Sequence, residues 1–94
     1  MTGRKSVHVR IEGKVQRVWY RNWTVREATG LGVTGWVRNR LDETVEAVFS
    51  GPEEAVDRLL KACWDGPPRA RVTAVTAVPC DPPANPGFEQ LPTG

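Results

Sequence analysis

The chain has 94 residues, of which 39% are hydrophobic and 26% charged, and these values predict one soluble globular domain spanning residues 1–94. It has no apolar run long enough to cross a bilayer and no signal-peptide core near its start, so we expect a cytoplasmic protein with no membrane partner. The net charge is only +2, but residues 1–41 hold nine basic and two acidic side chains, which suggests an anionic partner unless folding mixes the two halves.

The first predicted element is a half-buried strand over residues 6–12, because Val7, Val9 and Ile11 alternate there with polar residues. The glycine that follows is expected to end this strand and to open a loop over residues 13–20.

A helix is predicted over about residues 21–31, and Gly32 follows its last turn as a stop signal. Two strands are predicted next, over residues 34–40 and 44–50. Only residues 41–43 separate them, which predicts a hairpin.

A second helix is predicted to begin in residues 50–54, with Ser50 as its cap, Pro52 in its first turn, and two glutamates near the positive end of its dipole. Apolar residues then recur at helical spacing. They are Val56, Leu59, Leu60, Cys63 and Trp64.

A fourth strand is predicted over residues 71–78, and residues 79–86 form a proline-rich loop before a short edge strand over residues 87–91, with Phe88 as its anchor. The order βαββαβ predicts an α+β fold of the ferredoxin-like type, an antiparallel sheet with two helices on one face. Because this arrangement serves many functions, the site must decide the activity.

The loop over residues 13–20 is the candidate site. A junction between a strand and a helix gathers unpaired backbone N–H groups at the positive end of the helix dipole, which suits an anion. Arg21 follows the loop, and its planar guanidinium could add a bidentate contact to a phosphate.

Residues 13–21, GKVQRVWYR, resemble the phosphate-loop signature of the acylphosphatase family, which ends in an arginine. Residues 35–39, GWVRN, resemble the second signature of that family, and the resemblance extends over essentially the whole chain. It implies hydrolysis of a small-molecule acyl phosphate to a carboxylate and inorganic phosphate without a metal. We expect no cofactor, and nothing in the sequence requires more than a monomer.

The resemblance also implies roles for particular residues. Arg21 pairs with the phosphoryl oxygens, and Asn39 holds the attacking water. Backbone N–H groups of the loop cradle the same oxygens, and they belong to Val15, Gln16, Arg17, Val18, Trp19 and Tyr20.

The implied reaction suits a site without a strong base. The leaving group is a carboxylate, whose conjugate acid has a pKa near ~4, so it departs without much protonation. Positioning of the water and stabilisation of the phosphoryl charge are then sufficient.

Two positions depart from the family pattern. The family usually has glycine at Arg17, and positive φ there would cost an arginine about 1–2 kcal/mol. We expect activity to be retained, with the arginine stem lying outward. Glycine is also common at Glu43, where the change is expected to alter the hairpin turn rather than the chemistry.

For several side chains the sequence allows two interpretations. Gln16 either braces the loop or contacts the substrate, and Trp19 and Tyr20 either stack on an aromatic acyl group or pack. Free thiols are favoured for Cys63 and Cys80, although a disulfide between them stays open. The single histidine, His8, is expected to be exposed or hydrogen-bonded rather than catalytic.

Two other functions are compatible with the fold. One is a non-enzymatic anion- or nucleic-acid-binding domain, which the basic first half would suit, although the glycine–aromatic signature of RNA-recognition domains is missing. The other is an acylphosphatase-like module for carbamoyl-phosphate chemistry within a larger protein, against which the shortness of the chain argues. We therefore expect no nucleic-acid partner.

Overall fold

The sheet is built around β1 (Arg4–Lys14), which lies between β3 (Val45–Pro52) and β4 (Arg71–Pro79) and runs antiparallel to both. On the far side of β3, β2 (Thr34–Asn39) also pairs antiparallel, and β5 (Phe88–Gln90) lies outside it. The strand order is β4-β1-β3-β2-β5.

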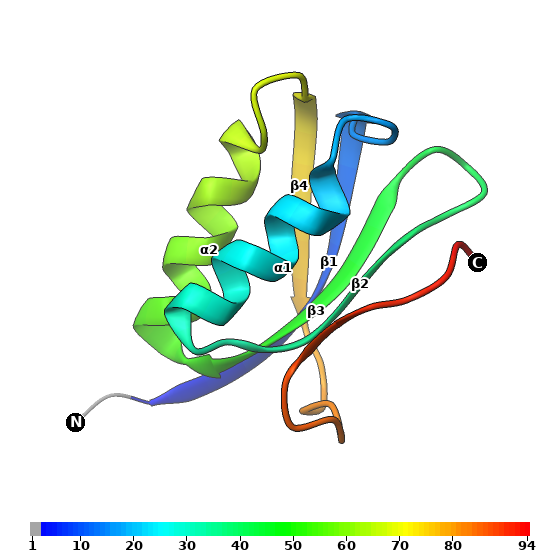
Figure 1. Ribbon diagram of the computed structural model, residues 1–94. Coiled ribbons are helices and arrows are strands. Elements are labelled where there is room, and N and C mark those ends of the chain that lie inside the picture. Colours follow the sequence, from blue (N-terminus) through cyan, green and yellow to red (C-terminus); the bar gives the residue numbers. More distant parts are fainter. Residues whose placement is uncertain (1–2) are drawn as a thin grey trace.

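The computed structural model describes residues 3–94, and it places α1 (Tyr20–Leu31) and α2 (Glu53–Asp65) together on one face of this sheet (Figure 1). The predicted α+β order and the placement of the helices are therefore confirmed. Within the described residues, neither helix is long and apolar enough to cross a membrane.

The antiparallel prediction needs one correction, because β5 runs parallel to β2 and makes the complete sheet mixed. The proline-rich segment after β4 carries the chain to the opposite edge of the sheet and reverses its direction (Figure 1). Since β4 and β2 run in opposite directions, a strand that reverses β4 must run parallel to β2.

The core lies between the sheet and the helices, and the alternation on β1 is confirmed because Val7, Val9 and Ile11 are buried. On β5, Phe88 packs against Phe49 of β3, with ring centroids 5.9 Å apart. Trp64 is 51% exposed, so the predicted apolar face of α2 does not include it.

The start of α2 differs from the prediction. Ser50 belongs to β3, where its hydroxyl lies 2.7 Å from the hydroxyl of Ser6, and Pro52 is the residue before the first turn of α2. Ser50 is therefore not a cap, because the strand continues through it. The glutamates in the first turn of α2 are confirmed.

Strand β1 continues beyond Gly13 to Lys14, so the predicted strand end was too early. A bulge between Glu12 and Gly13 shifts the register against β4, and Gly13 has a φ of 121°. A Cβ atom at this position would lie 2.1 Å from the carbonyl oxygen of Arg71, so only glycine fits. The bulge directs the chain into the loop before α1.

Candidate active site

The loop between β1 and α1 is anchored by three buried side chains. Val15, Val18 and Tyr20 are buried, whereas Arg17 and Trp19 are exposed. The Tyr20 hydroxyl donates a hydrogen bond to the carbonyl oxygen of Cys63, 2.5 Å away. Tyr20 is therefore a core residue rather than a stacking partner for the substrate. The three buried side chains hold the loop backbone at the surface.

Gln16 ties the loop to the hairpin between β2 and β3. Its side-chain Nε2 donates to the carbonyl oxygens of Arg40, at 2.8 Å, and Thr44, at 2.9 Å. The side chain is thus a brace, and any contact of Gln16 with a phosphate would come from its backbone.

The backbone of the loop has the form of an anion-binding nest. Arg17 and Trp19 have positive φ values of 61° and 68°, and Val18 between them does not. Such alternation turns successive N–H groups toward one side. Within residues 3–94, the N–H groups from Gln16 to Trp19 have no hydrogen-bond partner, and no side chain caps α1.

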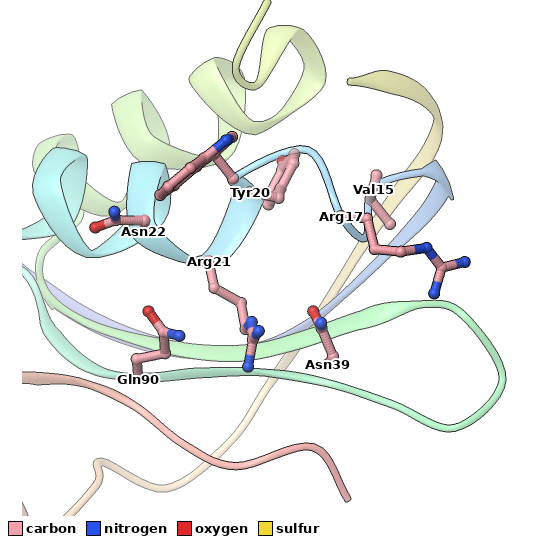
Figure 2. A pocket seen from close by; sticks show the side chains of 8 residues that line it. Val15, Arg17, Tyr20, Arg21, Asn22, Asn39 and Gln90 are labelled. Atoms are coloured by element: carbon pink, nitrogen blue, oxygen red, sulfur yellow. The ribbon is translucent and has the colours of Figure 1, made fainter. Parts of the chain in front are cut away.

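Arg21 and Asn39 face one cavity of about 490 Å³, the first from α1 and the second from the end of β2 (Figure 2). The loop forms another wall of this cavity. The complete lining is Val15, Arg17, Trp19, Tyr20, Arg21, Asn22, Asn39 and Gln90. The structure thus brings together both residues to which the resemblance gives catalytic roles.

Asn39 is only 9% exposed, and its Oδ1 atom has no hydrogen-bond partner within the described residues. Leaving a buried acceptor unpaired costs about 1–3 kcal/mol. An oxygen of this kind is expected to accept a hydrogen bond from a water or a ligand in the cavity.

In the folded chain, many of the basic residues of the first half of the sequence form ion pairs with acidic residues of the second half. Each ion pair in residues 3–94 joins a basic residue of the first half to an acidic residue of the second. The pairs are Lys5–Asp57, His8–Glu46, Arg10–Asp42, Arg17–Glu43, Arg38–Glu46 and Arg40–Glu46. Arg21 has no acidic partner within the same residues, so its charge is available to an anion.

Glu46 forms three of these ion pairs, on the face of the sheet away from the helices. Burial alone would raise the pKa of Glu46, but hydrogen bonds from His8 and Arg38 hold it below the usual value. His8 is therefore hydrogen-bonded, as predicted, and lies outside the cavity of Arg21.

The predicted hairpin is confirmed, and its turn keeps Asn39 at the end of β2. The Asp42 carboxylate accepts hydrogen bonds from the Thr44 hydroxyl and backbone N–H, at 2.6 Å and 3.1 Å. These bonds, followed by the nearby charge of Arg10, lower the pKa of Asp42. Glu43, with a φ of 73°, takes the left-handed position that ends a three-residue turn.

Arg17 and Glu43, the two residues at usual glycine positions, contact each other. The Arg17 side chain is 79% exposed, and its Nη2 lies 3.1 Å from Oε1 of Glu43. The arginine stem therefore lies outward at the rim of the cavity. Both residues have positive φ, so each carries backbone strain that glycine would not.

We expect Arg17→Gly to raise the free energy of unfolding by up to about 1 kcal/mol, because relief of the left-handed strain exceeds the loss of an exposed ion pair. Catalytic efficiency should stay within about tenfold of wild type. Urea unfolding and steady-state kinetics test these values, with Glu43→Gly as the matched variant. A many-fold rise in efficiency would mean that Arg17 hinders the site.

Two lining residues, Asn22 and Gln90, were not predicted from the sequence. Asn22 follows Arg21 in the first turn of α1, so its position could have indicated it. Gln90 reaches the cavity only because β5 pairs with β2, which the sequence pattern did not show.

The remaining reactive groups lie apart from this cavity. Cys63 and Cys80 are free thiols, as favoured, and burial raises the pKa of Cys63 to about 12. Within residues 3–94, no group of three or more His, Cys, Asp or Glu side chains is arranged to hold a metal ion.

Comparison with known proteins shows the family to which the chain is similar. The family model described as Acylphosphatase matches residues 7–90. A curated acylphosphatase from Rhodospirillum rubrum is 58% identical over 89 residues, which are 95% of this chain and 98% of the relative.

Two solved structures are also similar. An acylphosphatase from Coxiella burnetii superposes with a TM-score of 0.90 at 32% identity, covering 94% of this chain and 93% of its own. An acylphosphatase from Bacillus subtilis gives a TM-score of 0.88 at 29% identity, with coverages of 92% and 97%.

Proposed function

The chain belongs to the acylphosphatase family and hydrolyses acyl phosphates to a carboxylate and inorganic phosphate, and we propose that Arg21, Asn39 and the loop backbone perform this reaction. Arg21 and the N–H groups of residues 15–20 bind the phosphoryl oxygens. Asn39 holds the water that attacks phosphorus.

In the proposed reaction, the water oxygen forms a bond to phosphorus while the bond from phosphorus to the acyl oxygen breaks. The carboxylate leaves with the electron pair of that bond. The proton of the water passes to a phosphoryl oxygen or to the departing carboxylate. No protein acid or base is required, because the carboxylate is a good leaving group.

One observation carries this proposal. Among residues 3–94, a buried Asn39 with an unpaired oxygen and an Arg21 without an acidic partner line the same cavity as the loop nest. A phosphoryl group bound at the nest would place its charge beside Arg21 and leave Asn39 free to orient a water.

The site of attack can be tested by hydrolysing benzoyl phosphate in ¹⁸O-labelled water with a chelator present. We expect one labelled oxygen in the inorganic phosphate and none in the benzoate, measured by mass spectrometry. Uncatalysed hydrolysis, measured without enzyme under the same conditions, is the control. Label in the benzoate would mean attack at the acyl carbon, which would contradict the role given to Asn39.

We extend the proposal to a cytoplasmic monomer in which residues 1–94 act as one domain. The two free thiols support a reducing compartment. The alternative of a nucleic-acid-binding domain loses its main support, because five of the nine basic residues in the first half pair with acids.

A further inference from the structure

Trp19 is a large apolar side chain that the core does not use. The residue is 73% exposed, and its backbone has a φ of 68°, a left-handed conformation that is unfavourable for a large side chain. Nearby aromatic rings pack on each other, as Tyr20 and Trp23 do with centroids 5.3 Å apart. An exposed indole on a strained backbone points to a contact with a ligand.

Trp19 lines both the Arg21 cavity and a second cavity of about 470 Å³, which we call the acyl groove. Asn22 also lines both, so the two cavities lie next to each other at the first turn of α1. The groove walls combine apolar with charged residues, and the apolar ones are Val18, Trp19, Trp23, Pro67 and Pro68.

The geometry of the reaction directs the leaving group toward this groove. In phosphoryl transfer the attacking and leaving oxygens lie roughly in line across phosphorus. Asn39 is on the sheet, whereas Asn22 is on α1, and Figure 2 shows Arg21 between them. With phosphorus beside Arg21, a water held by Asn39 on the sheet would place the acyl oxygen on the side of α1, where Asn22 lines both cavities.

We propose that the acyl groove binds the acyl group of the substrate and that Trp19 stacks on it, so that the enzyme selects acyl phosphates with an aromatic acyl group. This inference rests on the proposed function, because Arg21 and Asn39 fix the position and direction of the phosphoryl group. The apolar walls and the exposed indole suit a flat aromatic ring better than a methyl group.

The test compares kcat and KM for benzoyl phosphate and acetyl phosphate, which share the phosphoryl group and differ in the acyl group. In Trp19→Ala, we expect the benzoyl-to-acetyl ratio of kcat/KM to fall about tenfold, mainly through the KM for benzoyl phosphate. Trp19→Phe should restore part of the ratio. Pro68→Asp, on another wall of the groove, should lower the ratio independently.

Trp64→Ala is the matched control, since Trp64 is an exposed tryptophan on α2 outside both spaces, and neither substrate should respond to it. An unchanged ratio in Trp19→Ala and Pro68→Asp would overturn the inference, and so would an equal loss for both substrates. A failure of the proposed function would give a different result from a failure of this inference. In that case Arg21→Ala and Asn39→Ala would keep wild-type activity with either substrate.

Discussion

Arg21→Ala is expected to lower kcat/KM for benzoyl phosphate on the order of 10³–10⁴-fold. The reason is that a guanidinium beside the transferring phosphoryl group stabilises the negative charge that develops in the transition state. Inorganic phosphate should also inhibit the variant more weakly, since it binds through the same contacts. Steady-state kinetics with phosphate as a competitive inhibitor measures both effects.

The Arg21 variant should remain folded. Within residues 3–94, Arg21 makes no ion pair and no side-chain hydrogen bond, so its truncation removes no contact that supports the core. Arg58→Ala, on the exposed side of α2, is the control for loss of a positive charge far from the cavity. Unfolding in urea should give similar midpoints for the three proteins.

Arg21→Lys separates charge from geometry. Lysine keeps the positive charge but lacks the planar pair of donors that matches two phosphoryl oxygens. We expect it to recover only part of the lost efficiency. Wild-type efficiency in Arg21→Ala would contradict the site assignment, even though the family activity of the chain would stand.

Asn39→Ala is expected to lower kcat by about 10²–10³-fold and to leave inhibition by inorganic phosphate nearly unchanged, because its role is to orient water rather than to bind phosphate. The variant should be as stable as wild type or more stable. Its side-chain oxygen is buried without a partner, and removing an unpaired acceptor removes its desolvation cost.

Asn85→Ala is a control in which the loss of an asparagine is expected to affect stability and not activity. The Asn85 side chain donates hydrogen bonds to the carbonyl oxygens of Gly35 and Gly87, each at 2.7 Å, and it lies outside the cavity. Its loss should lower the free energy of unfolding and leave kcat unchanged. If Asn39→Ala instead lost stability and kept its kcat, Asn39 would be a structural residue.

Local sequence was sufficient to predict most helices and strands and to name the candidate site residues. Alternation of Val7, Val9 and Ile11 with polar residues is a local property, and it was sufficient to predict the inward face of β1. The motifs around Arg21 and Asn39 were likewise short and continuous, so their residues could be named before their cavity was seen.

Only the tertiary structure decided which charges and side chains are available to a substrate. Arg38 and Arg40 are neighbours of Asn39 in sequence, yet both form ion pairs with Glu46 on the adjacent strand. Arg21 faces the cavity and has no acidic partner in the part of the chain that the structure describes. Gln90 entered the cavity through the parallel pairing of β5, and Trp19 proved to be exposed. Such results depend on pairing between distant strands and on packing, and a local pattern of residue types contains neither.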